Sequence, residues 1–577
     1  MSVRDPSPLA LNLPRWRALV MLGLLIAGFA ALAGRALYLQ GVRHDFLQQK
    51  GEARHSRVIA IPAHRGVITD RRGEVLAVST PVESVSASPQ DLEATPEQLR
   101  RLASALRMDA SELRRRLSDG GREFVYLKRQ LPPDEAAKVV ALGVPGVFLQ
   151  REFRRYYPAG DVLAHVIGFT GVDDNGQEGI ELAFQDQLAG KPGSRRVIKD
   201  RLGRIVEDVE SIRAPRPGRE LALSIDLKLQ YLAYRELKLA VEEHRAKAGG
   251  IVVLDAVTGE VLALANLPTY NPNNRATLSG ARARNRAVTD VFEPGSTLKP
   301  FTAAAALEAG LFRPDTVLQT APGSLTIGKA TIRDAHPQGA LTVAEVIQKS
   351  SNVGAAKMAL ALPAENLWNL FKSVGFGVPT GTGFPGEVGG RLRPHASWRP
   401  IEQATLSYGH GISVTLLQLA RAYTVLAGDG ELKPVSLTRL DAAVGGAQVI
   451  SPATAQAVRA MLELAVQPGG TAPKARVAGY RVAGKTGTAH KLEGAGYAAN
   501  RYVSSFVGFA PVSNPRLIVA VMIDEPSAGQ YYGGSVAAPI FSRVMGGALR
   551  SLNVPADAPN GPLELPPADA PEIREEV

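Results

Sequence analysis

Three short motifs in the second half of the chain carry the residue types needed for acyl transfer through a serine ester. The first places Ser296 three residues before Lys299, in the first turn of an expected helix, so that both side chains lie on one helix face. A serine hydroxyl needs an adjacent base to act as a nucleophile. The Lys299 amine can be that base only if it is unprotonated, which requires burial or a neighbouring cation, for which Lys485 is the candidate. Alone, this pattern also fits a solvated pair of side chains on a helix.

The second motif is Ser350-Ser351-Asn352, which interrupts a helical pattern over residues 343–362. In the functional interpretation, Ser350 relays a proton and Asn352 donates a hydrogen bond to a substrate. A helix break or a helix cap would explain the same residues, because short polar side chains favour both.

The third motif follows an alternating stretch over residues 477–483 and is predicted to lie on an edge strand. Its members are Lys485, Thr486, Gly487 and Thr488. Gly487 would let a ligand backbone approach the strand closely. The Lys485 amine and the threonine hydroxyls could bind a carboxylate. Because all three motifs occur in this order, we interpret them as parts of one active site.

Residues 479–486 also fit the phosphate-loop pattern Gly-x-x-x-x-Gly-Lys-Thr. Such a loop needs a buried strand before it and a helix that starts at the lysine. Residues 487–496 are rich in glycine and residues 472–476 are no core strand, so we regard this match as accidental.

Metal, cofactor and nucleic-acid chemistry find little support in the sequence. The nine histidines occur singly and there is no cysteine, so we expect no metal, no cofactor and no disulfide. The net charge of +11 could indicate an anionic partner. Its densest stretch, residues 100–129, has few aromatics and no nucleic-acid motif, and we interpret it as a solvated helical face.

An apolar segment near the N-terminus predicts a membrane anchor over residues 18–40. It contains a run of 17 uncharged residues, from Ala18 to Gly34, between flanking arginines. A cleaved signal peptide is the competing interpretation, because residues 31–33 resemble a cleavage site. The length of the run favours an uncut anchor, and the flanking charges leave its orientation open.

The remaining chain is expected to form two domains and a tail. A mixed segment over residues 41–218 ends at a Pro-rich boundary and includes a short strand over residues 75–77. Residues 219–552 have strand patterns at both ends and helical patterns between them, which predicts an α+β domain with one antiparallel sheet. Residues 553–577 are Pro-rich and acidic, and we expect a flexible tail.

The three motifs together resemble the signature of penicillin-binding proteins and serine β-lactamases. Over nearly its whole length the chain is similar to class B penicillin-binding proteins. The residues that carry this resemblance are 65–71, 178–181, 293–300, 349–354 and 531–534. The last of these favours the cell-division members of the family over the elongation members.

The resemblance implies an α+β fold with a single N-terminal transmembrane helix, a mixed pedestal (dimerisation-type) domain and a transpeptidase domain. The transpeptidase domain would contain an antiparallel sheet flanked by helices, as in serine β-lactamases. Residues 1–17 would be cytoplasmic and the catalytic domain periplasmic, anchored in the inner membrane. The implied partners are peptidoglycan stem peptides, β-lactam antibiotics, an FtsW-type glycosyltransferase and other membrane proteins of the division machinery.

The resemblance also implies a role for each motif in septal D,D-transpeptidation. Ser296 would attack the penultimate D-alanine carbonyl, Lys299 would take its proton, and Ser350 would relay a proton to the leaving amine. Asn352 would hold the donor backbone, and backbone N–H groups of Ser296 and Thr488 would form the oxyanion hole. The donor carboxylate would be bound by Lys485, Thr486 and Thr488. A β-lactamase or β-lactam sensor stays open as an alternative, although Ser351 in place of an aspartate disfavours a hydrolase.

Overall fold

The computed structural model describes residues 15–43, 56–90, 92–118, 124–199, 205–493 and 496–558. Near the N-terminus, helix α1 (Arg15–Leu37) continues into a π-helical turn over residues 38–42. Within the described residues, the stretch Arg15–Gly41 is long and apolar enough to cross a membrane. The helix therefore begins three residues before the anchor that the sequence predicts.

The chain divides into two compact units that interleave along the sequence. One unit comprises residues 1–63, 81–152 and 191–216, and the other comprises residues 64–80, 153–190 and 217–577. The segments 64–80 and 153–190 thus pack with the C-terminal part of the chain, on the far side of the boundary expected at residue 218.

The first unit contains an antiparallel sheet and a small helical core. The sheet has the order β1-β8-β9, formed by Ser56–Ile61, Gly193–Lys199 and Ile205–Arg213. Strand β3 (Val75–Ala87) reaches ten residues beyond the short strand predicted at residues 75–77. Its residues from 81 onward belong to this unit, where they pair with β4 (Val125–Leu131). Three helices pack on this end around buried leucine and valine side chains: α3 (Pro96–Ala105), α4 (Ala110–Leu117) and α5 (Pro133–Val140).

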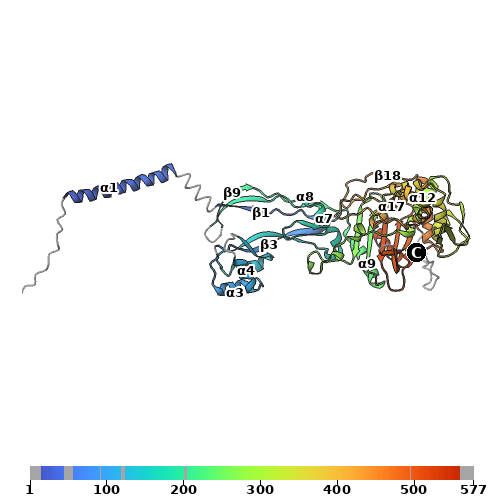
Figure 1. The fold of residues 1–577 in the computed structure, drawn as a ribbon, viewed down its shortest axis with the longest axis horizontal. Helices are drawn as coiled ribbons and strands as arrows, with labels where there is room; N and C mark the ends of the chain where they lie inside the picture. The colour runs from blue at the N-terminus through green and yellow to red at the C-terminus, as the bar shows by residue number, and fades with distance from the viewer. Residues whose placement is uncertain are drawn as a thin grey trace, which may run out of the picture. The chain divides into compact units, whose positions relative to one another are not determined.

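A five-stranded antiparallel sheet forms the centre of the second unit, with the order β12-β11-β21-β20-β19. Its C-terminal strands are drawn in red in Figure 1. Its strands are β11 (Ala248–Asp255), β12 (Val261–Leu267), β19 (Ala483–Glu493), β20 (Gly496–Ala510) and β21 (Leu517–Asp524). Because β11 pairs with β21, strands from distant parts of the chain lie side by side. The predicted antiparallel sheet is confirmed, and β19 is its edge strand.

The two faces of this sheet are covered by different helices. Alternate residues of a strand point to opposite faces. Ile251 and Val253 belong to the core that includes α9 (Leu227–Glu243) and α19 (Gly533–Ser551), whereas Val252 belongs to the core that includes α17 (Leu416–Ala427). Both faces are therefore closed by apolar packing, which holds the sheet edge rigidly.

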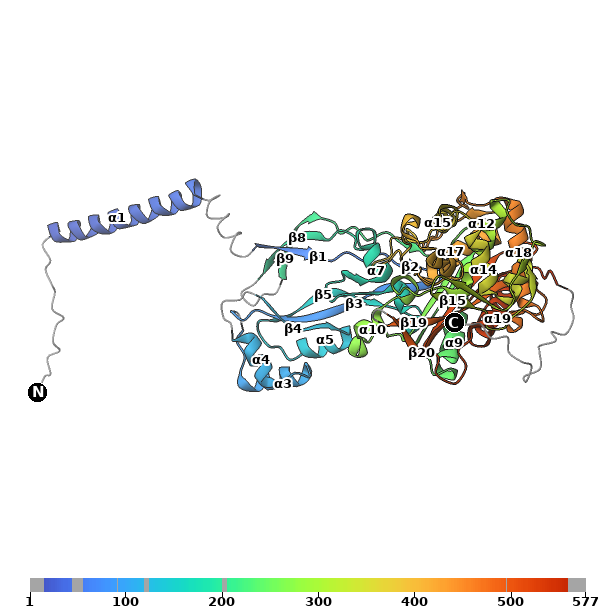
Figure 2. The same cartoon turned by 45° about the vertical axis from the view of Figure 1, so that its right-hand side comes forward.

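The helical layer surrounds α12 (Lys299–Glu308), which packs against α14 (Asn352–Leu360) and α18 (Pro452–Val466) (Figure 2). The pattern over residues 343–362, expected to be one helix, instead forms α13 (Val343–Lys349) and α14 (Asn352–Leu360). The break lies at Ser350, whose backbone is left-handed with a φ of 62°. Ser351 then caps α14 by accepting a hydrogen bond from the Gly354 N–H. The second motif is thus a helix break, and the polar side chains of the motif lie at this break.

The tail predicted from residue 553 is fixed at its start by hydrogen bonds. The Tyr480 hydroxyl donates to the Val554 carbonyl at 2.7 Å, and the Arg481 N–H donates to the Asp557 carboxylate at 2.7 Å. Contacts with distant loops therefore hold residues 554–558. The rest of the predicted tail lies outside the described residues.

Candidate active site

Ser296 lies in a 3₁₀ turn, η4 (Gly295–Leu298), that leads directly into α12. The sequence predicted the first turn of an α-helix. The structure has the tighter 3₁₀ turn instead, and this turn begins at the left-handed Gly295 (φ 57°), directly after Pro294. Ser296 is 6% exposed, so its hydroxyl lies in a nearly closed site. A side chain at Gly295 would lie 3.2 Å from the Thr488 carbonyl, so this turn contacts the third motif.

Lys299 begins α12 and is completely buried. Its Nζ donates to Ser350 Oγ at 3.0 Å and also to the Ser350 carbonyl. The first and second motifs are thus joined by a direct hydrogen bond between the two groups that the sequence assigns to proton transfer. A proton can pass between the Lys299 amine and the Ser350 hydroxyl along this contact.

The turn at Ser350 is positioned by Asp334, which follows β15 (Ala330–Arg333). Asp334 accepts hydrogen bonds from the Ser351 hydroxyl at 2.7 Å and from the Val353 N–H at 2.9 Å. The Asn352 amide donates to the Arg333 carbonyl at 3.1 Å, and an amide nitrogen has a second hydrogen that can reach a substrate. Sequence reasoning missed Asp334, because no local pattern connects an isolated aspartate with a motif further along the chain.

The third motif lies on β19, as predicted. Lys485 is fully buried and donates to Thr486 Oγ1 at 3.0 Å, and Thr488 Oγ1 accepts a hydrogen bond from the Gly533 N–H at 3.0 Å. Lys485 pairs with Val507 of β20 in a regular antiparallel register. A phosphate loop needs a helix from the lysine onward, whereas this chain continues as a strand to Glu493. The accidental nature of the phosphate-loop match is confirmed.

Gly487 lets β19 contact the turn that carries Ser296. A side-chain carbon at this position would lie 2.5 Å from Ser505 Oγ, 2.7 Å from the Pro294 carbonyl and 2.9 Å from Thr297 Cγ2. The sequence analysis assigned the missing side chain to the approach of a ligand. In the structure, the turn beside Ser296 occupies that space, so glycine is needed for the first and third motifs to meet.

Two further titratable side chains, His410 and Glu293, lie near these motifs. His410 is half-buried, and desolvation of the ring together with the positive charge of Lys299 lowers the pKa of its imidazole to about 4. Burial raises the pKa of Glu293, whose carboxylate accepts hydrogen bonds from the Gly411 N–H at 2.8 Å and the Tyr497 hydroxyl at 3.0 Å. At neutral pH the imidazole is therefore neutral beside the lysine.

A sheet edge that meets a buried serine and lysine at the start of a helix belongs to enzymes that form serine acyl intermediates. Residues 249–546 match the family described as "Penicillin binding protein transpeptidase domain", and residues 60–223 match "Penicillin-binding Protein dimerisation domain". The chain belongs to the penicillin-binding proteins, as the three motifs predict.

Curated relatives match over most of the chain. "Probable peptidoglycan D,D-transpeptidase PenA" of Neisseria gonorrhoeae is 46% identical over 539 residues, covering 93% of this chain and 92% of the relative. "Peptidoglycan D,D-transpeptidase FtsI" of Escherichia coli K12 is 43% identical over 553 residues, covering 95% and 94%.

Solved structures agree with this assignment. The transpeptidase domain of Burkholderia pseudomallei penicillin-binding protein 3 has 50% sequence identity and a TM-score of 0.55, covering 58% of this chain and 98% of that one. A peptidoglycan synthetase from Bifidobacterium adolescentis has 26% identity and a TM-score of 0.70, covering 89% of this chain and 99% of that one.

Proposed function

We propose that this protein is a peptidoglycan D,D-transpeptidase that crosslinks stem peptides of the septal wall through an ester on Ser296. The hydrogen bond from Lys299 Nζ to Ser350 Oγ carries the proposal, because it connects two separate motifs beside the serine. The relatives named FtsI and PenA support the same activity.

In the acylation step, Ser296 Oγ attacks the carbonyl of the penultimate D-alanine. The serine proton passes to Lys299, the new C–O bond forms, and the C–N bond to the terminal D-alanine breaks. Ser350, hydrogen-bonded to Lys299, delivers a proton to the leaving amine.

The negative charge on the carbonyl oxygen needs two donors, for which the backbone N–H groups of Ser296 and Thr488 are the candidates. Their segments are in contact, since a side chain at Gly295 would lie 3.2 Å from the Thr488 carbonyl. Loss of one such donor typically costs about 3–4 kcal/mol of transition-state stabilisation.

The donor is held by groups on both sides of the serine. Asn352 contacts the backbone of the donor. The terminal carboxylate of the donor lies against Lys485, Thr486 and Thr488, and Gly487 keeps their strand close to the turn that carries Ser296. In the deacylation step, the amine of a neighbouring stem peptide attacks the ester, the new C–N bond forms as the C–O bond to Ser296 breaks, and the proton lost by the amine passes to the serine. β-Lactams acylate the same serine because they resemble the D-alanyl-D-alanine donor.

Helix α1 anchors the protein in the inner membrane as a single span, with residues 1–17 cytoplasmic and the catalytic domain periplasmic. Residues 41–218 act as a pedestal and residues 219–552 as the transpeptidase domain. An FtsW-type glycosyltransferase supplies the glycan strand, alongside other membrane proteins of the division machinery. The apolar α1 and the relatives named FtsI support this placement.

The acyl-enzyme can be tested with full-length protein in detergent. After exposure to a penicillin, peptide mass spectrometry should locate one adduct on Ser296, and it should persist for many minutes. Ser296→Ala should lack the adduct, whereas Ser527→Ala, at an exposed serine, should keep it. An adduct that water removes within seconds would indicate a β-lactamase and contradict the transpeptidase proposal.

The septal role is tested in cells depleted of the native protein. Ser296→Ala should leave long filaments, because side-wall growth continues without division. Round cells would instead indicate an elongation enzyme and contradict the septal assignment.

A further inference from the structure

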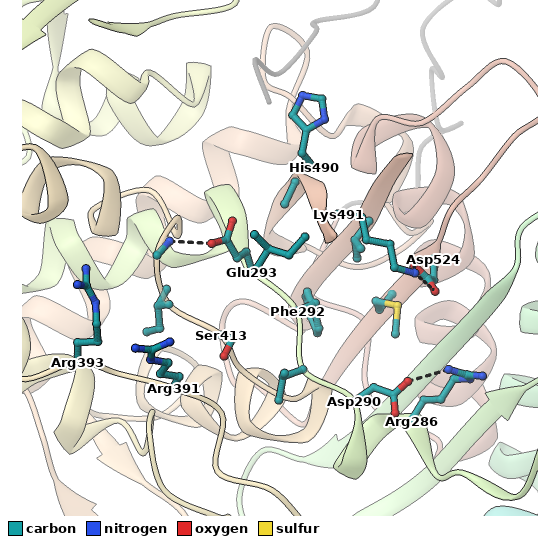
Figure 3. A pocket seen from close by; sticks show the side chains of 17 residues that line it. Arg286, Asp290, Phe292, Glu293, Arg391, Arg393, Ser413, His490, Lys491 and Asp524 are labelled. Carbon is teal, nitrogen blue, oxygen red and sulfur yellow. Dashed lines mark hydrogen bonds and ion pairs between the residues drawn. The ribbon is translucent and has the colours of Figure 1, made fainter. Parts of the chain in front are cut away.

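Two other segments of the chain form hydrogen bonds with the turn that carries Ser296 and with the residues just before it. At a cavity of about 520 Å³, the Glu293 carboxylate accepts a hydrogen bond from the Gly411 N–H at 2.8 Å (Figure 3). Within the apolar core, the Tyr423 hydroxyl donates to the Thr297 carbonyl at 2.8 Å. Tyr423 belongs to α17 and lies 126 residues further along the chain. The second contact therefore joins the turn to a distant helix.

The side chain of Tyr423 is completely buried. Its ring packs almost perpendicular to the ring of Phe301 in α12, with 5.5 Å between the two centroids. Phenylalanine would fill this apolar space equally well, whereas a buried hydroxyl costs free energy unless it has a hydrogen-bond partner. Burial raises the pKa of the Tyr423 hydroxyl well above its ordinary value, so the hydroxyl keeps its proton and acts as a donor. What the hydroxyl adds to the ring is therefore the hydrogen bond to Thr297.

The Thr297 carbonyl lies where the hydrogen-bond pattern of the chain changes. In the 3₁₀ turn, the Lys299 N–H donates to the Ser296 carbonyl three residues earlier, whereas α12 continues with the four-residue spacing of an α-helix. Pro300 has no N–H, so it cannot give the Ser296 carbonyl an α-helical hydrogen bond. The geometry of such a junction depends on contacts from outside the helix, and Tyr423 supplies one of them.

Helix α17 can fix this turn relative to the third motif. It packs against β11 and β21 of the central sheet, and the edge strand β19 of the same sheet carries the third motif. Tyr423 thus connects the turn that carries Ser296 to the framework that holds β19. The turn and the strand are in close contact, because a side-chain carbon at Gly487 would lie 2.9 Å from Thr297 Cγ2. A shift of Thr297 would therefore move Ser296 relative to β19.

We propose that Tyr423 is a positioning residue for the acylation of Ser296. Its hydroxyl holds the Thr297 carbonyl, and this contact keeps the Ser296 hydroxyl and backbone N–H at the spacing from β19 that the reaction requires. The proposal rests on the proposed transpeptidase function and adds a residue outside the three motifs on which the rate of ester formation depends. Tyr423 acts through Thr297 and not on the donor, because its side chain is enclosed in the core.

Tyr423→Phe removes the hydroxyl and keeps the ring that packs on Phe301. Full-length protein in detergent is mixed with a fluorescent penicillin at several concentrations, and stopped-flow fluorescence follows ester formation. The concentration dependence separates the dissociation constant of the first complex from the rate constant of acylation. The rate constant should fall about tenfold, because misplacing reacting groups by about 1 Å can cost about 100-fold and the loss of one bond should shift the turn by less. The dissociation constant should stay within about twofold, because the strand that binds the carboxylate is unchanged.

Tyr270→Phe is the matched control for the loss of a buried hydroxyl. Tyr270 is also buried, and its hydroxyl also donates to a backbone carbonyl, that of Ala164 at 3.0 Å. Its ring packs against His165 and Phe169, in a segment that carries none of the three motifs. Each variant loses one buried hydrogen bond, so the two melting temperatures should fall by similar amounts. Only Tyr423→Phe should form the ester slowly.

A different donor at the same position should restore the reaction. Incorporation of 4-aminophenylalanine at position 423 places an N–H group where the hydroxyl was. This donor should bring the acylation rate constant back to within about threefold of wild type. A role in folding alone would leave the rate constant unchanged in all of these variants.

Four outcomes would overturn the proposal. An unchanged rate constant in Tyr423→Phe would mean that the hydroxyl serves folding alone, and a much larger fall in melting temperature than in Tyr270→Phe, or failure to fold, would mean the same. An equal loss of rate in Tyr270→Phe would assign the effect to general loss of stability. A raised dissociation constant with an unchanged rate constant would assign it to binding. Absence of a penicillin adduct on Ser296 in the wild-type protein would instead refute the proposed function.

Discussion

Replacing Gly487 by alanine should push β19 away from the turn that carries Ser296. The new carbon would lie 2.7 Å from the Pro294 carbonyl and 2.9 Å from Thr297 Cγ2. An ordinary contact begins near 3.4 Å, so the turn or the strand must move by about 0.7 Å. Both elements are buried at this contact, and overpacking of this kind typically costs about 1–3 kcal/mol of folding stability.

The same displacement should also slow the acylation reaction. A displacement of about 1 Å in an active site can slow the reaction by about 100-fold, so Gly487→Ala should acylate about 10- to 100-fold more slowly. The second-order rate constant with a fluorescent penicillin measures this effect. Gly496→Ala, in β20 of the same hairpin, is the control, because no atom of the described residues, its chain neighbours apart, lies within 4 Å of its added carbon. Acylation of Gly487→Ala within about twofold of wild type would refute the reasoning.

Three other perturbations probe the groups that support the site. Asp334→Ala leaves the Ser351 hydroxyl and a backbone N–H without their acceptor, so it should slow penicillin acylation by about tenfold or more; an unchanged rate would contradict the positioning role. Glu181 bridges two buried arginines at 2.6 Å each, so Glu181→Gln should lower stability by about 3–5 kcal/mol in thermal unfolding, whereas Glu97→Gln on an exposed pair should change little. Burial lowers the pKa of His165 from 6.5 to about 4. As the pH falls, the imidazole therefore takes up a proton in the unfolded chain before it does so in the folded chain, and folding stability should fall between pH 6.5 and about 4. His165→Gln should flatten the fall in melting temperature, and an identical pH profile would refute this contribution.

The chemistry of the site could be predicted from sequence because each motif is local. Ser296 and Lys299 are joined by a single helical turn, and Lys485 to Thr488 are consecutive residues of one strand. Their types and order were sufficient to identify the family. The edge position of β19 also followed, because strand patterns occur at both ends of the domain and helical patterns fill the middle.

Features that depend on long-range packing could not be predicted in this way. The apolar pattern continues across Ser350, so periodicity alone gave one helix where the structure has two. Asp334 acts through a turn that is distant in sequence, and Gly487 contacts a segment far earlier in the chain. The hydrogen bonds that fix Val554 and Asp557 likewise come from distant loops, so composition alone predicted a tail there.

A crystal structure of the penicillin acyl-enzyme would test most directly whether the three motifs converge on one hydroxyl. It should show an ester on Ser296, with the carbonyl oxygen about 2.7–3.1 Å from the backbone nitrogens of Ser296 and Thr488 and the penicillin carboxylate against Lys485. An adduct on any other residue, or a carboxylate that lies away from Lys485, would contradict the account.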